Sequence, residues 1–183
     1  MPDPAERLSQ LLLNHPQRMH LLGIVSAIAL PDCWIGAGFV RSLVWDCLHG
    51  RTTSPIDSDV DVVWFDPARA MGALDREIEI RLNLIEPSVK WSVSNQARMH
   101  ARNGDNAYCS TEDAIKHWPD TAGAVAVRLV GRRIEIIAPY GLSDLFSLTA
   151  RPTPPFEGEK LSVFHARLQE KRWLQRWPQL VLR

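Results

Sequence analysis

A short turn of small residues, followed by a helix and then by a strand with two aspartates, most constrains this fold. Between residues 33 and 66, a brief apolar run stops at the turn 36–38, whose sequence is Gly-Ala-Gly. A pattern of apolar residues at three- and four-residue spacing follows and ends before Gly50, as expected of a helix. A Thr/Ser/Pro loop then leads to residues 59–65, which are dense in β-branched and aromatic side chains. This order predicts a strand–helix–strand unit.

Two acidic side chains share one face of the second predicted strand. Because side chains alternate along a strand, Asp59 and Asp61 point to the same side. Like charges at such close spacing repel each other, so a cation is expected to compensate them. Mg²⁺ binds one or two carboxylates and completes its shell with phosphate oxygens and water. The pattern therefore predicts Asp59 and Asp61 as ligands of Mg²⁺.

The turn before the helix offers what a phosphate group needs. Gly36, Ala37 and Gly38 allow a close approach to the backbone, and the helix N-terminus presents free N–H groups. A phosphate-binding turn therefore precedes a metal-binding acid pair by one helix. Together, the two features predict a magnesium–nucleotide site.

The same order of elements resembles the signature of the DNA polymerase β-like nucleotidyltransferase superfamily. Residues 37–41, Ala-Gly-Phe-Val-Arg, resemble the Gly-Gly-x-Val-Arg start of CCA-adding enzymes and bacterial poly(A) polymerases. Three later segments, which begin at Trp91, Ala138 and Lys171, are similar to an uncharacterised bacterial family of nucleotidyltransferase-like proteins. This second resemblance covers most of the chain from Trp34 onward.

The resemblance implies both a fold and a chemistry. The fold is α+β and polymerase-β-like, with a mixed sheet of about five strands and flanking helices. The chemistry is two-metal transfer of a nucleoside monophosphate from an NTP to an acceptor hydroxyl, in which Asp59 and Asp61 bind two Mg²⁺ ions. Arg41 would reach a phosphate oxygen, and Asn95 and Arg98 would contact the base or a phosphate.

The third carboxylate of the superfamily is missing where it is expected. It usually lies on the strand after the next helix, and the corresponding strand here carries Ser92 instead. Glu135 is an alternative third catalytic acid, although a cross-strand pair with Arg128 or Arg132 is the interpretation we favour. Two functions therefore stay open: a nucleotidyltransferase, and a non-catalytic nucleotide-binding or interaction module. An acid close to the pair would favour the enzyme, and Ser92 alone would favour the module.

A single domain over residues 1–183 is expected from the length of the chain. We divide it into N-terminal helices (1–30), a core (31–150) and a C-terminal helix that packs back on the core (156–183). Residues 94–110 are polar and are predicted to form a long loop. The strands are predicted near residues 33–36, 59–65, 89–93, 124–130 and 133–138.

Composition narrows the partners and the compartment. The formal net charge is zero and 45% of the residues are hydrophobic, as in an ordinary globular protein. We find neither a signal peptide nor an apolar run of about 18 residues, so we expect a cytoplasmic protein that does not bind a membrane. The segment from Lys160 to Arg183 contains six Lys or Arg residues and one Glu. We favour a solvated helix face over a nucleic-acid contact for this basic segment. The acceptor stays open among small molecules, proteins and RNA.

Overall fold

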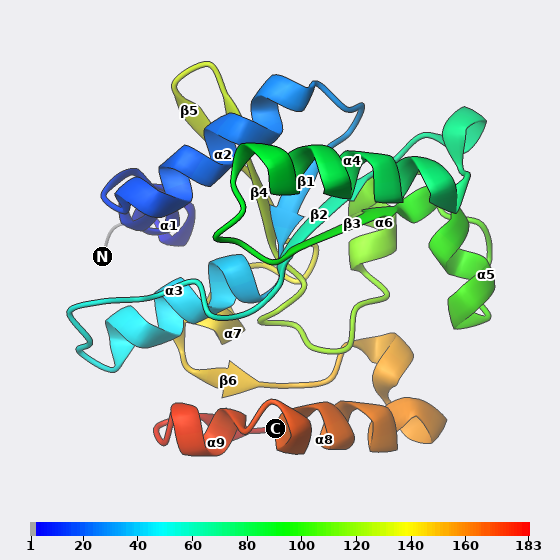
Figure 1. Cartoon of the computed structure of the whole chain (residues 1–183). Coiled ribbons are helices and arrows are strands. Elements are labelled where there is room, and N and C mark those ends of the chain that lie inside the picture. The colour runs from blue at the N-terminus through cyan, green and yellow to red at the C-terminus, as the bar shows by residue number, and fades with distance from the viewer. Residues whose placement is uncertain (1–2) are drawn as a thin grey trace.

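A five-stranded mixed sheet forms the centre of the computed structural model, which describes residues 3–183 (Figure 1). Its strand order is β3-β2-β1-β4-β5. β1 is antiparallel to both β2 and β4, β2 and β3 are parallel, and β4 and β5 form a hairpin. The strands are β1 (Trp34–Gly36), β2 (Val60–Trp64), β3 (Trp91–Asn95), β4 (Ala126–Val130) and β5 (Arg133–Ile137). The predicted α+β class, with a mixed sheet of about five strands, is confirmed.

Helices cover both faces of this sheet. α2 and α4 lie side by side on one face, and the short α6 lies on the other. Further along the chain, a second, two-stranded parallel sheet joins β6 (Thr149–Ala150) to β7 (Val181–Leu182). The helices are α1 (Pro4–Leu13), α2 (Pro16–Ile28), α3 (Gly38–Leu48), α4 (Gly72–Ile85), α5 (Met99–Asn103), α6 (Thr111–Ile115), α7 (Ser143–Phe146), α8 (Leu161–Glu170) and α9 (Trp173–Arg176). No helix within residues 3–183 combines the length and the apolar character that crossing a bilayer requires.

Alternation along the strands divides the core between the two faces. Ile35 and Val62 are paired on β1 and β2, are both fully buried, and belong to the main core with α2 and α4. Trp34 and Val63 are paired one position away and belong to the smaller core that contains α6. Burial on both faces accounts for the nearly continuous apolar sequence of β2.

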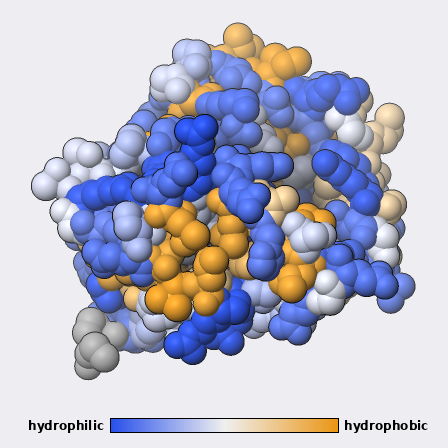
Figure 2. Space-filling model, turned by 90° about the horizontal axis from the view of Figure 1, so that it is seen from below, coloured by the Kyte–Doolittle hydropathy of each residue, from blue (hydrophilic) through white to orange (hydrophobic). Residues whose placement is uncertain are grey.

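The C-terminal segment packs back through tryptophans. Trp45 on α3 makes edge-on contacts with Trp173 and Trp177, at ring-centroid distances of 5.4 and 5.1 Å. All three rings are at most 2% exposed, and the indole N–H of Trp177 donates to Oδ1 of Asp46 over 2.8 Å. α8 and α9 consequently form a layer along one side of the molecule (Figure 1). That side is largely hydrophilic but has an apolar patch (Figure 2), and Leu174 is among the exposed apolar side chains of this segment.

A buried polar network fixes the loop that leads to β2. Arg18 on α2 is 1% exposed and donates to the carbonyl oxygens of Phe39 and Ser54 over 2.9 and 2.7 Å. The Ser54 hydroxyl donates in turn to Oδ2 of Asp46 over 2.7 Å. Burial lowers the pKa of Arg18 to about 10, so the guanidinium still carries its charge at neutral pH. The loop is therefore held against α2 and α3 just before the acid pair.

Two predicted elements differ in the structure. Residues 94–110 contain a 3₁₀ turn, Gln96–Arg98, and α5, because the side chain of Asn95 accepts the N–H of Ala97 and starts a helical turn that apolar periodicity does not reveal. The single C-terminal helix that we expected is divided into α8 and α9. Arg172 has φ 49°, a left-handed conformation that ends α8 and turns the chain.

The tryptophan contact predicts a large loss of stability for Trp177→Ala. Removal of a fully buried indole should lower the free energy of unfolding by about 3–5 kcal/mol. The matched control is Leu174→Ala, a residue 44% exposed in the same segment, which should cost about 1 kcal/mol or less. Urea unfolding of the three proteins measures this difference, and equal costs for the two variants would contradict the packing described here.

Candidate active site

Three neighbouring strands bring Gly36, Asp61 and Ser92 into one row on the same face of the sheet. Asp61 on β2 pairs with Gly36 on β1 and with Ser92 on β3. Asp59 lies just before β2, with a side chain 43% exposed, and its Oδ1 is 2.8 Å from Nζ of Lys90. The acid pair therefore has one carboxylate largely withdrawn from water and one at the surface.

The carboxyl group of Asp61 has a raised pKa. Burial is the main cause, and the nearby charge of Asp59 adds to it. The guanidinium groups of Arg167 and Arg41 and the hydroxyl of Ser92 act in the opposite direction. A site that desolvates a carboxylate beside a second one favours a cation between them.

The turn between β1 and α3 is tight and has little free space. Ala37 has φ 52° and ψ −121°, a conformation that L-residues rarely adopt, and its N–H donates to the carbonyl of Val125 over 3.1 Å. A Cβ at Gly36 would lie 2.6 Å from the ring of Trp118. The first N–H groups of α3, those of Gly38 and Phe39, have no acceptor within the helix. The phosphate-binding geometry predicted for residues 36–38 is thus reduced to these two groups.

Arg41 is buried, lines the same hollows as Asp61 and lacks part of its hydrogen bonding. Its side chain is 6% exposed, and its guanidinium stacks on Trp173 at 4.0 Å and on Trp45 at 5.3 Å. Nη1 lies 3.6 Å from Oδ2 of Asp120, too far for a hydrogen bond. Neither Nε nor Nη1 has an acceptor among residues 3–183. Burial lowers the pKa of Arg41 to about 10, against the attraction of Asp120, and the group remains a cation at neutral pH.

Two hollows meet at this point. The larger, of about 550 Å³, runs from Asp61 over the end of β3 to α5 and the segment that follows α6. The smaller, of about 200 Å³, lies between the N-terminus of α3 and the C-terminal helices. Arg41, Asp61 and Arg167 line both hollows. These three side chains therefore form the junction of a continuous site.

The structure does not bring Glu135 to this junction. Glu135 lies on β5 and forms an ion pair with Arg128 on β4, whose Nη2 is 2.6 Å from Oε2. Three strand positions separate it from Asp61, which at about 4.8 Å a strand is roughly 14 Å across the sheet. Glu135 has the cross-strand role that we favoured, and it lines neither hollow.

The two polar residues predicted after β3 have different positions. Asn95 is fully buried, and its amide is used within the protein: it donates to the carbonyl oxygens of Asp66 and Arg69 over 2.8 and 3.0 Å. It is therefore not free to contact a ligand. Arg98 lines the larger hollow and is bonded to Asp75 on α4, while its Nε is buried without an acceptor in the described chain.

Sequence patterns did not reveal several residues of the site. Asp120 follows α6 and is 1% exposed, and Arg167, Lys171 and Arg176 come from the C-terminal segment. The excess of basic residues after residue 160 was the available signal. Lys171 is exposed, as a solvated helix face predicts, whereas Arg167 and Arg176 are only partly exposed. All three side chains line the hollow beside the acid pair.

The donor set fits one magnesium ion carried by a nucleotide. Within residues 3–183, no three His, Cys, Asp or Glu side chains gather into a metal-binding group. Asp59 and Asp61 supply hard oxygen donors next to two helix N–H groups and the unpaired nitrogens of Arg41. Mg²⁺ is commonly held by one or two carboxylates together with substrate phosphates. The second Mg²⁺ ion that the resemblance implies stays a prediction.

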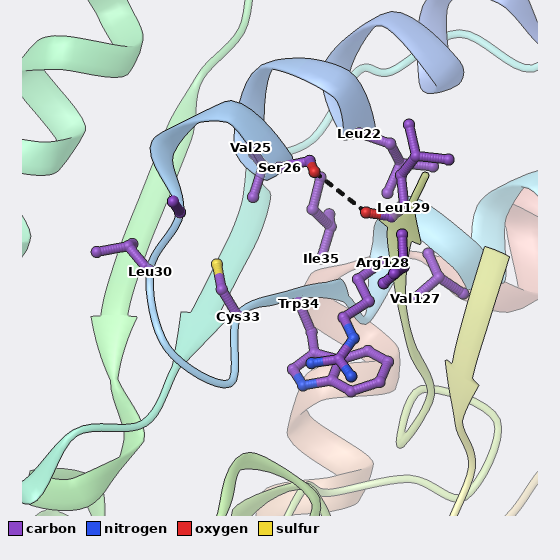
Figure 3. A pocket seen from close by; sticks show the side chains of 12 residues that line it. Leu22, Val25, Ser26, Leu30, Cys33, Trp34, Ile35, Val127, Arg128 and Leu129 are labelled. Carbon is purple, nitrogen blue, oxygen red and sulfur yellow. Dashed lines mark hydrogen bonds between the residues drawn. The ribbon is translucent and has the colours of Figure 1, made fainter. Parts of the chain in front are cut away.

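A third hollow, of about 170 Å³, lies away from the acid pair between α2 and strands β1 and β4 (Figure 3). Its wall is mostly apolar, and the guanidinium of Arg128 lies 4.1 Å over the ring of Trp34. The one cysteine in this wall, Cys33, has a pKa raised to about 12 by burial. Its thiol is therefore protonated at neutral pH and is not a nucleophile.

Comparison with known proteins shows the family of this chain. A family model described as nucleotidyltransferase matches residues 23–182. This chain therefore belongs to a nucleotidyltransferase family. No curated protein shows significant sequence similarity to it.

Solved structures narrow the fold further. An NMR structure, described as revealing a CCA-adding enzyme head domain, is 30% identical, with a TM-score of 0.86 over 97% of this chain and 95% of that chain. The CCA-adding enzyme of Thermotoga maritima complexed with tRNA is 15% identical, with a TM-score of 0.60 over 95% of this chain and 42% of that one. A CCA-adding enzyme complexed with ATP is 16% identical, with a TM-score of 0.57 over 100% of this chain and 42% of that one. The fold is that of a nucleotidyltransferase head domain, and the chain spans about two-fifths of the length of these larger enzymes.

The raised pKa of Asp61 predicts a pH-dependent stabilisation by Asp61→Asn. Wild-type stability should fall as the pH rises from the unfolded-state pKa through the higher folded-state pKa, because the desolvated carboxylate must then lose its proton. The variant lacks this ionisation, so it should be more stable than the wild type at pH 7 and lose that advantage below about pH 4. Unfolding curves at several pH values measure the difference. Glu77→Gln, at an exposed position, is the control for the loss of one carboxylate. An Asp61→Asn protein that is less stable than the wild type at pH 7 would contradict the prediction.

Proposed function

We propose that this protein is a magnesium-dependent nucleotidyltransferase that moves a nucleoside monophosphate from an NTP to a hydroxyl group of an acceptor. The observation that carries the proposal is the junction of Asp61 with Arg41. A desolvated carboxylate and a buried guanidinium without acceptors for two of its nitrogens line the same two hollows. Mg²⁺ would bind the carboxylate, and a phosphate group would accept hydrogen bonds from the guanidinium.

Each residue of the site has a separate role in this proposal. Asp59 and Asp61 would hold Mg²⁺, which, when bound, neutralises charge on the phosphates and on the leaving pyrophosphate. The N–H groups of Gly38 and Phe39 would orient phosphate oxygens at the positive end of α3. Arg41 would donate to the phosphates from a fixed position, because Trp173 and Trp45 hold its guanidinium plane. Catalysis would then rest on positioning and on preorganised charge.

The larger hollow is where we place the rest of the substrates. It extends from Asp61 past Arg98 and Trp118, and its volume of about 550 Å³ lies within the usual range for small-molecule sites. Related structures contain CTP, ATP or tRNA, so NTP is the proposed donor. The acceptor stays open among a small molecule, a protein and RNA. We propose a cytoplasmic location, which the three unpaired cysteines suit.

One observation favours a second candidate, a nucleotide-binding module without transfer activity. Ser92, which has no carboxylate, is the β3 neighbour of Asp61. Asp120 is the other acid in the larger hollow, and it is already engaged by the N–H of Gly123 and by Arg41. If the acceptor hydroxyl needs a third carboxylate as its base, this site would bind a nucleotide without turning it over.

Nucleotide binding is tested by thermal stability with each NTP and Mg²⁺. At a hundredfold excess over Kd, a ligand specific for the native state should stabilise the wild type by about 2.7 kcal/mol. In Asp61→Asn the Mg²⁺-dependent part of this shift should vanish, because half of the acid pair is lost. Glu77→Gln is the charge-matched control outside the site. Absence of a shift with every nucleotide would overturn the proposed function, and both candidates with it.

Pyrophosphate release separates the two candidates. The enzyme should release pyrophosphate from the bound NTP in a Mg²⁺-dependent manner when candidate acceptors are supplied, and the module should not. Ser92→Asp places a third carboxylate beside Asp61. We expect this variant to raise the release at least tenfold if the missing acid limits the reaction. Binding without release in the wild type, followed by release in Ser92→Asp, would establish the module.

A further inference from the structure

The C-terminal helix α8 places a cation at the acid pair that no part of the resemblance assigns. Arg167 lies on α8, 106 positions after Asp61, yet it lines both hollows beside Asp61. Among the charges that act on Asp61, that of Arg167 has the largest effect. Its Nε is buried and has no acceptor among residues 3–183. A long-range contact of this kind indicates a function for the helix beyond packing.

Arg167 forms no close ion pair in the described part of the chain. Within residues 3–183, Arg176 forms an ion pair with Asp57, and Arg41 forms one with Asp120. Arg167 has no acidic partner within 4.0 Å in the same residues. Two guanidinium groups with buried, unsatisfied nitrogens thus flank a single carboxylate. Unsatisfied buried donors are costly, and charged ones more so, unless a ligand supplies the acceptors.

The smaller hollow is lined by side chains whose charges suit a phosphate chain. The N-terminus of α3 and Ser58 form one wall, and Arg167, Lys171 and Arg176 on the C-terminal segment form the opposite wall. The cations of this hollow outnumber Asp59 and Asp61, so the hollow favours an anion even with both acids charged. Guanidinium groups bind phosphate oxygens through paired N–H donors, which makes arginine better suited than lysine at such a wall.

We propose that Arg167 is a phosphate-binding residue, and that it and Arg41 hold the β- and γ-phosphates of the NTP from opposite sides of Asp61. This inference rests on the proposed function and adds that the C-terminal helix supplies half of the triphosphate site. Arg41 is fixed by Trp173 of the same C-terminal segment. The segment therefore positions one arginine and contributes the other.

Calorimetric titration of Arg167→Gln with inorganic tripolyphosphate and with a non-hydrolysable NTP, each with Mg²⁺, tests the assignment. We expect at least tenfold weaker binding of both probes than in the wild type, because a charged donor to phosphate is lost. Arg183→Gln is the matched control: it removes the same charge from the same C-terminal segment at an exposed position outside both hollows, and it should bind as the wild type does. Arg167→Lys should recover part of the affinity.

The outcomes separate this inference from the function on which it rests. If both Arg167→Gln and Arg183→Gln weaken binding equally, or if neither weakens it, the role of Arg167 is overturned and the proposed function stays intact. A wild type that binds neither probe would overturn both. Urea unfolding of Arg167→Gln provides the control for folding, and a variant as stable as the wild type with weakened binding of tripolyphosphate supports the assignment.

Discussion

The fully buried carboxylate of Asp46 is the interaction on which the arrangement of the site depends. It accepts hydrogen bonds from Arg51 and Ser54 in the loop before β2, and from Trp177 in the C-terminal segment. A charge withdrawn from water is tolerated only when its oxygens are satisfied in this way. One side chain on α3 thereby joins the loop that leads to the acid pair to the C-terminal segment. The elements of the candidate site are distant in sequence, and this hydrogen-bonded centre holds them together.

Around that centre the protein maintains charges that do not satisfy one another. Asp61 is desolvated beside Asp59, and the buried guanidinium nitrogens of Arg41 and Arg167 face a hollow in place of an acceptor. Such an arrangement lowers stability unless a ligand completes it, and functional sites are where proteins tolerate this cost. The strained backbone of Ala37 lies at the same place. Tight tryptophan packing in the adjacent core offsets these costs and keeps the site rigid.

The sequence was sufficient for the local pattern and insufficient for long-range contacts. The order of a small-residue turn, a helix and an Asp-x-Asp strand predicted the strand–helix–strand unit, because hydrophobic periodicity and glycine positions are local properties. The family came from the resemblance of that order to a known signature, and the family match confirms it. Asn95 was predicted to contact a ligand, but its side chain caps a turn. Its amide also donates to the carbonyl oxygens of Asp66 and Arg69, which are distant in sequence. Arg167 and Asp120 were missed for the same reason. Their proximity to Asp61 follows from how distant segments pack, which no spacing in the sequence encodes.

The break at Arg172 divides the C-terminal segment into two parts with different partners. α9 is fixed to Trp45 by Trp173, whereas α8 is anchored by Phe164 and Leu168, which are 2% and 6% exposed. Because both helices are anchored in the main core, the single left-handed residue between them sets the direction of one helix relative to the other. Arg167 directly precedes Leu168 on α8, so this direction also sets where its guanidinium lies relative to Asp61. The contact that we propose for Arg167 thus depends on the angle between two short helices.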